Sequence, residues 1–135
     1  MRYMLDTNIC IYIIKKKPSS VLARLREIPV SDVCISSITL AELEYGIAKS
    51  ARPQQNLEAL SGFLAPLELV EFGPDAASSY GILRAALEKM GQPIGSMDML
   101  IAAHSLSMAL TLVTNNEREF ARVPGLLLEN WASFQ

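Results

Sequence analysis

Apolar and polar positions along this chain follow two different spacings in turn. Short runs rich in apolar and β-branched residues predict strands at residues 2–6, 32–37, 68–72, 111–114 and, more weakly, 126–130. The stretches between them carry apolar residues at helical spacing and predict helices at residues 8–16, 18–27, 39–50, 53–64, 75–90 and 96–110. Strands that alternate with helices favour a parallel sheet covered on both faces. We therefore expect an α/β fold with a small central parallel sheet of four to five strands.

Proline, glycine and apolar content refine the predicted helices. Pro18 stands in the first turn of its helix, and Gly91 follows the end of another, both at favoured positions. Only two residues separate helices 39–50 and 53–64, which predicts an antiparallel pair. The helix at 96–110 is apolar nearly all round and should be largely buried.

Composition indicates one soluble domain spanning residues 1–135. Half of the residues are apolar, and a chain of this length buries roughly two thirds of its unfolded surface. The apolar runs fall short of the roughly 20 residues of a membrane span, and Asp6 interrupts any signal sequence, so we expect a cytoplasmic protein. Cys10 and Cys34 are interpreted as core residues, because they form no C-x-x-C motif and one histidine cannot complete a zinc site.

Acidic or amide side chains follow several of the predicted strands. Asp6 ends the first strand, Glu42 lies in the first turns of the helix after the second, and Asn116 and Glu119 follow the fourth. Ligand crevices of open α/β sheets lie beyond the carboxyl ends of the strands, so we expect these side chains to meet there. Asp98 joins them if its helix begins at the same edge.

A group of carboxylates in one crevice points to a divalent cation. Such carboxylates repel one another, and an unpaired buried charge is costly. Mg²⁺ is held by one or two carboxylates with waters and phosphate oxygens, and paired ions about 4 Å apart promote phosphodiester hydrolysis. The net charge of −2 is unlike that of a nucleic-acid binder. If four of the acids bind metal, however, 12 basic residues remain against 10 acidic ones. The net charge is then only weak evidence against a nucleic-acid substrate.

Each acidic position also has an ordinary interpretation as part of a helix cap. Asp6 could cap the helix that follows it, and Asp98 could be a first-turn acid favoured by the helix dipole. The spacing of a capping box occurs at Thr39–Glu42 and again at Asn116–Glu119. Capping explains each position singly, but it does not explain why all of them fall where one crevice is expected.

Two further features allow both a functional and an ordinary interpretation. His104 lies six positions after Asp98, about 240° round the helix, so it should point away from the site and have a structural role. A basic cluster is either a solvated face or a track for phosphates, and its members are Lys15, Lys16, Lys17, Arg24 and Arg26.

Four segments together resemble the PIN-domain ribonucleases, specifically the VapC-type toxins of bacterial toxin–antitoxin pairs. In chain order they are MLDTNICIYIIKKKP, ISSITLAELEYGIAKS, GQPIGSMDMLIAAHSL and LVTNNEREFARVPGL. The first three carry Asp6, Glu42 and Asp98 in the order of the family's acids. One departure concerns the position after "TN", which is commonly Asp in the family and is Asn116 here. Its amide is a weaker, neutral ligand, and Glu119 could substitute for it.

The resemblance implies a PIN-like three-layer fold and an endoribonuclease that uses Mg²⁺, with Mn²⁺ as a substitute. It implies cleavage of structured RNA, with initiator tRNA in the anticodon region as the expected substrate. It also implies a homodimer and a VapB-type antitoxin whose C-terminal segment covers the acidic site. The helix pair around Tyr45 and Phe63 would suit a dimer or antitoxin surface, or it contributes to the core.

On this hypothesis Asp6 and Asp98 bind the metal directly, and Glu42 acts through water or as a general base. The Asn116 amide, which would orient metal-bound water, is the fourth catalytic group, and supporting roles fall to Thr7, Asn8, Thr114 and Glu119. The rival interpretation is a PIN-like module that binds RNA or a protein without catalysis. A small phosphatase is disfavoured, because "LDTN" lacks the second Asp, two residues on, that haloacid dehalogenase-type phosphatases use.

Overall fold

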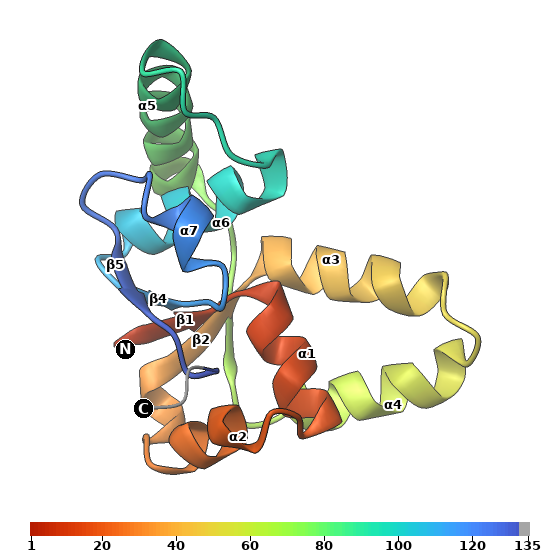
Figure 1. Cartoon of the computed structure of the whole chain (residues 1–135). Coiled ribbons are helices and arrows are strands. Elements are labelled where there is room, and N and C mark those ends of the chain that lie inside the picture. Colours follow the sequence, from red (N-terminus) through yellow and green to blue (C-terminus); the bar gives the residue numbers. More distant parts are fainter. Residues whose placement is uncertain (133–135) are drawn as a thin grey trace.

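A sheet of five parallel strands forms the centre of the protein, in a computed structural model that describes residues 1–132 (Figure 1). The strand order is β3-β2-β1-β4-β5, and Met4 of the central strand pairs with Cys34 on one side and Leu112 on the other. The strands are β1 (Tyr3–Leu5), β2 (Val33–Ser36), β3 (Glu68–Val70), β4 (Thr111–Val113) and β5 (Leu127–Glu129). The prediction of a small parallel sheet is confirmed. The last three residues of the predicted domain lie outside the described part.

The six predicted helices are present, with ends that differ by one to three residues at most positions. They are α1 (Thr7–Lys15), α2 (Ser19–Arg26), α3 (Ser37–Ala48), α4 (Pro53–Leu64), α5 (Pro74–Lys89) and α6 (Ser96–Ser107). A short helix and a 3₁₀ turn were not predicted, because neither is long enough to show a periodic pattern. These are α7 (Glu117–Phe120) and η1 (Val30–Asp32).

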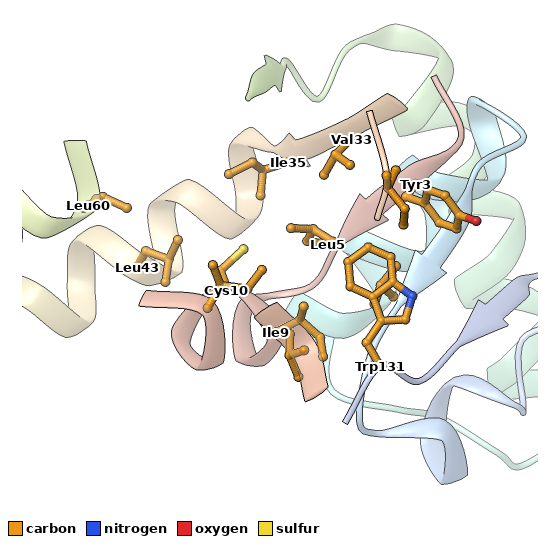
Figure 2. Packing of buried hydrophobic residues seen from close by; sticks show 13 residues of the cluster. Tyr3, Leu5, Ile9, Cys10, Val33, Ile35, Leu43, Leu60 and Trp131 are labelled. Carbon is orange, nitrogen blue, oxygen red and sulfur yellow. The ribbon is translucent and has the colours of Figure 1, made fainter. Parts of the chain in front are cut away.

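Successive strand residues point into two separate cores. Tyr3 and Leu5 pack with α1, α2 and the α3–α4 pair on one face (Figure 2), where the Trp131 ring meets the Tyr3 ring edge-on at a centroid distance of 5.5 Å. Met4 and Leu112 pack with α5, α6 and α7 on the other face. Because both faces are covered, the central strand β1 is apolar and buried at every position, and the expected three-layer arrangement is confirmed.

Other expectations about the core are met as well. Cys10 and Cys34 are both buried free thiols, one in each core. Helix α6 is buried over most of its length, as its apolar circumference predicted. After α5, Gly91 has φ +68°, a left-handed conformation that glycine adopts without a steric penalty. None of the helices in the described residues is long and apolar enough to span a membrane.

Helices α3 and α4 form the predicted antiparallel pair. In Figure 1 they extend away from the sheet as an arm, joined at its far end by a short turn. Tyr45 on α3 is 67% exposed, whereas Phe63 on α4 is half-buried against the first core. The arm therefore starts at the carboxyl edge of β2 and carries its outer half into solvent.

Candidate active site

Asp6 is a buried carboxylate at the junction of β1 and α1. It is the N-cap of α1, and its Oδ1 accepts a hydrogen bond from the Ile9 amide at 2.9 Å. Burial raises the pKa of the Asp6 carboxyl from 3.8 to about 6, and the charge of Glu42 adds to the rise, while hydrogen bonds from Thr114 and Ile9 oppose it. The cap interpretation is thus correct, yet it is incomplete. A group used only as a cap has no need of a buried position beside another carboxylate.

Glu42 does not belong to a capping box. Helix α3 begins two residues earlier than predicted, because the Ser36 side chain caps it by accepting from the Ile38 amide at 3.0 Å. Glu42 therefore lies in the second turn, too far along the helix to bond the cap. Its Oε1 instead accepts the hydroxyl proton of Thr7 at 2.6 Å. This contact joins α3 to the first turn of α1, directly after Asp6.

Asp98 belongs to the same electrostatic group. It is the third residue of α6, which follows Gly95. Burial raises the pKa of Asp98 from 3.8 to about 6, and the carboxyl groups of Glu119, Glu42 and Asp6 raise it further. Helix α6 therefore does begin at the carboxyl edge of the sheet. Four acids from four separate segments repel one another here, as the positions of the predicted strands implied.

The segment after β4 brings Glu119 to this group and gives Asn116 an orienting contact. Asn116 donates its side-chain amide to Glu119 Oε2 at 3.0 Å, and its backbone N–H donates to the Thr114 hydroxyl at 2.9 Å. The capping-box interpretation of Asn116–Glu119 is wrong, because the backbone N–H of Asn116 donates to Thr114 and not to Glu119, and the Asn116 side chain caps no backbone amide. Thr114 is fully buried and also bonds the Asp6 carboxylate.

A second polar chain borders the site, and two of its members were not predicted. Asn8 donates to Asn115 Oδ1 at 3.4 Å, and Asn115 donates to the Tyr12 hydroxyl at 2.7 Å. Tyr12 and Asn115 are separated by 103 positions in the sequence. Their only signal in the sequence was the adjacency of Asn115 to Thr114 and Asn116, which does not reveal a partner on α1.

The donor chemistry of the site fits a hard divalent cation. Carboxylate oxygens are the preferred ligands of Mg²⁺, and a cation would favour the ionised forms that burial and repulsion now oppose. Among residues 1–132, however, no three His, Cys, Asp or Glu side chains lie close enough to hold an ion by themselves. A bound Mg²⁺ would therefore need waters or substrate phosphate oxygens to complete its coordination, as is usual for this ion.

Comparison with known proteins identifies the family. The PIN domain matches residues 3–126 of the chain. This chain belongs to the PIN-domain family. It is 48% identical over 132 residues to Ribonuclease VapC2 of Rickettsia felis, covering 97% of this chain and 98% of that protein. It is 46% identical over 132 residues to the tRNA(fMet)-specific endonuclease VapC of Shigella flexneri, covering 98% of this chain and 99% of that one.

A solved structure shares the whole PIN fold. It is VapBC2 from Rickettsia felis bound to a DNA fragment from their promoter, with a TM-score of 0.91, 47% identity, and coverage of 97% of this chain and 99% of that one. The expected resemblance to VapC-type PIN domains is confirmed on both sequence and fold.

The lysines of the basic cluster lie at the opposite end of α1 from Asp6. Lys15 ends α1, and it lines one groove together with Glu42. Lys16 and Lys17 follow and are exposed. Arg24 is not a free cation, because it lies 3.2 Å from Glu27 and 3.7 Å from Glu129. Lys15 is therefore the member of the cluster with the clearest connection to the site.

Proposed function

We propose that this protein is a metal-dependent endoribonuclease, the toxin of a type II toxin–antitoxin pair in the cytoplasm. The observation that carries the proposal is the gathering of Asp6, Glu42, Asp98 and Glu119 at one sheet edge, where Glu42 raises the pKa of both aspartates and Glu119 raises that of Asp98. The names of the relatives, a VapC2 ribonuclease and a tRNA(fMet)-specific endonuclease, support RNA as the substrate. Within structured RNA, we propose initiator tRNA, cut in the anticodon region.

Two carboxylates would hold the cation. Asp6 is held in place by the Ile9 amide and Thr114, and Asp98 by the start of α6, so both present oxygens from rigid elements. When bound, Mg²⁺ or Mn²⁺ supplies positive charge to the scissile phosphate and lowers the pKa of a water molecule. These two side chains orient that charge toward the phosphodiester.

Glu42 is proposed as the general base. Thr7 donates to Oε1 of Glu42, which fixes the carboxylate and leaves Oε2 to take a proton from the attacking water. Because water is the nucleophile, no neighbouring 2′-hydroxyl is needed. The products should therefore carry 5′-phosphate and 3′-hydroxyl ends.

Glu119 is proposed as the fourth acid in place of the family's Asp, and Asn116 as the group that orients it. The 3.0 Å contact uses the amide nitrogen of Asn116 as a donor, which holds the Glu119 carboxylate toward Asp98. On this proposal Asn116 acts on the cation through Glu119 and is a weak ligand at most.

A VapB-type antitoxin and a second copy of the chain are the proposed partners. The solved VapBC2 complex supports the first of these. The groove between α1, α3 and α4 is apolar with Lys15 and Glu42 at its border, so a segment seated in it would reach the acidic site. Its apolar lining includes Ile11, Ile14, Leu43, Ile47 and Leu60.

The decisive experiment compares cleavage by matched variants. Purified protein is incubated with initiator tRNA and with an elongator tRNA, with Mg²⁺, with Mn²⁺ and with EDTA, and the RNA ends are sequenced. We expect metal-dependent cleavage that Asp98→Asn abolishes and that Glu44→Gln, an exposed acid two residues from Glu42, leaves intact.

The rival function is a PIN-fold module that binds RNA without cutting it. The absence of a three-ligand site among residues 1–132 is the observation in its favour. RNA binding by the wild type that is unaffected by Mn²⁺ and by Asp98→Asn, without cleavage at any metal concentration, would establish the rival and overturn the nuclease.

A further inference from the structure

His104 is joined to the helix that carries Glu42. Its Nδ1 lies 2.8 Å from the hydroxyl of Ser36, a residue 68 positions earlier in the chain, and both residues are buried. Ser36 ends β2 and is the N-cap of α3. His104 lies on α6, six residues beyond Asp98. The predicted structural role of His104 is therefore correct. Its hydrogen-bond partner, Ser36, lies at the start of α3, the helix that carries Glu42.

The hydrogen bonds around the ring determine which atom donates. The Ser36 oxygen already accepts from the Ile38 amide at 3.0 Å, so its own proton is available for His104 Nδ1. The backbone carbonyl of Glu71 acts against the fall in the pKa of His104, so it faces the ring and favours a proton on Nε2. The neutral tautomer with its proton on Nε2 can accept from Ser36 at Nδ1 and face the Glu71 carbonyl with Nε2–H. Burial lowers the pKa of His104, which is consistent with this form.

The same contacts join three segments at the carboxyl edge of the sheet. Next to Glu71, the Phe72 amide donates to the Ser37 hydroxyl at 3.0 Å, and the Phe72 ring meets the His104 ring edge-on at 5.4 Å. The β2–α3 junction, the segment after β3 and helix α6 thus meet at one imidazole. The acidic side chains that line the neighbouring hollow, Glu71 and Asp75, are exposed.

Helix α3 depends on this junction for its direction. It is the upper half of the protruding arm in Figure 1, and only Thr39 and Leu43 among its twelve residues are buried. The Thr39 hydroxyl has no hydrogen-bond partner. Ser36 therefore anchors the N-terminal end of the helix, next to the bond from the Phe72 amide to Ser37, and the ring of His104 holds that end against α6.

We propose that His104 is a positioning residue that aligns Glu42 with Asp98 by holding the cap of α3 against α6. The inference rests on the proposed function, because Glu42 and Asp98 are assigned to catalysis there. Loss of the Ser36 contact lets the N-terminal end of α3 shift, and this shift moves Glu42 relative to the water it deprotonates. Substrate binding is retained.

Two substitutions separate the two hydrogen bonds of the ring. His104→Asn keeps an acceptor near Nδ1 for Ser36, whereas His104→Gln keeps a donor near Nε2 for Glu71 and loses the acceptor. We expect His104→Gln to lower kcat by roughly 10- to 100-fold, as the loss of an orienting partner does at enzyme sites, with KM little changed. The His104→Asn variant should recover most of that loss. Equal activity of the two variants would overturn the proposal.

A double-mutant cycle with Glu42→Gln tests the route of the effect. If His104 acts through Glu42, then His104→Gln lowers the residual rate of the Glu42→Gln variant by less than twofold. A full additional loss in that background would show a general structural role and overturn the proposal. Should a His104 variant fail to fold, Ser36→Thr, which keeps the hydroxyl, and Ser36→Ala supply the same comparison.

Amide exchange keeps this inference distinguishable from the proposed function. The Ile38 N–H is bonded by Ser36, so it should exchange about tenfold faster in His104→Gln than in the wild type, by the measured rates of hydrogen exchange. This readout needs no RNA. If the wild type cleaves RNA but the Ile38 amide exchanges at the same rate in His104→Gln, only the positioning role is overturned. If the wild type does not cleave RNA, the proposed function is overturned.

Discussion

Thr7 donates its hydroxyl proton to Glu42 Oε1 at 2.6 Å, so the residue after one buried acid holds the next acid of the site in place. The contact spans 35 positions and ties α1 to α3 beside the carboxyl ends of β1 and β2. A hydroxyl that donates to a carboxylate restricts both its rotamer and the lone pair left for chemistry. The two residues therefore act as one unit.

Thr7→Val should lower kcat because it removes this donor while keeping the shape of the side chain. We expect a loss of roughly 10- to 100-fold, the usual cost of removing an orienting partner. Thr7→Ser keeps the hydroxyl and is the matched control, with activity within a few fold of the wild type. Steady-state cleavage of a labelled tRNA measures both, and equal kcat for the two variants would contradict the assignment.

Asp98→Asn should abolish cleavage without destabilising the metal-free protein. Burial and three neighbouring carboxyl groups already disfavour the charged form of Asp98, so a neutral amide relieves repulsion. We expect Tm in EDTA to be unchanged or higher by a few degrees, about 2 to 5 °C. Thermal unfolding followed by circular dichroism measures this, and a marked fall in Tm would show that Asp98 serves the fold.

The metal-free protein should be more stable near pH 5 than near pH 7.5. The pKa of Asp6 is about 6 in the fold and about 3.9 in an unfolded chain, so between these values the folded state binds more protons. Stability therefore falls as pH rises from about 4 to about 6 and is level above that for this group. Over the tested interval Asp6 contributes about 1 to 2 kcal/mol.

Urea unfolding in EDTA at the two pH values measures this effect. The Asp6→Asn variant keeps a good helix cap and should show a smaller difference, and the comparison with it removes the contribution of the titrating groups that do not interact with Asp6. The prediction is contradicted if the wild type, compared with Asp6→Asn, is less stable at pH 5 than at pH 7.5. That result would show that its surroundings stabilise the ionised Asp6 carboxylate.

Asn116→Asp should increase the response of the protein to Mn²⁺. The substitution places a second carboxylate beside Glu119 and removes the donor that holds it, so the metal-free protein becomes less stable. Because a ligand stabilises the fold by RT ln(1 + [L]/Kd), tighter binding gives a larger rise of Tm with Mn²⁺ than in the wild type. A smaller rise would indicate that Asn116 is a better ligand than this structure suggests. Asn130→Asp, a change at a residue that bonds Glu117, is a matched control.

Lys15→Gln should weaken RNA binding more than Arg24→Gln. Lys15 borders the groove that contains Glu42, whereas the charge of Arg24 is shared with Glu27 and Glu129. Loss of one phosphate contact reduces the slope of log K against log salt by about 0.7 for a single strand. Salt-dependent binding to a tRNA, with Asp98→Asn in every protein to prevent cleavage, measures the slopes. Equal slopes for the two variants would contradict a specific contact between Lys15 and an RNA phosphate.

Much of the fold could be predicted because local patterns reflect local physics. Alternation of apolar strands with amphipathic helices predicted the parallel sheet, and Pro18 and Gly91 marked helix boundaries, with Pro18 at the N-cap of α2 and not in its first turn as predicted. The two-residue error at the start of α3 mattered most. Either Ser36 or Thr39 can cap a helix, and only the bond from the Ile38 amide to Ser36 decides between them.

The sequence by itself determined that Asp6 follows a buried strand, that α6 is buried, and that acids occur where the strands end, since these depend on periodicity and chain order. The resemblance to PIN-domain ribonucleases added the assignment of roles. Only the tertiary structure decided that Thr7 holds Glu42, that Asn116 is a donor to Glu119, and that His104 contacts Ser36. Such contacts depend on how the helices cross above the sheet. That geometry results from the packing of both cores together, so no short stretch of residues predicts it.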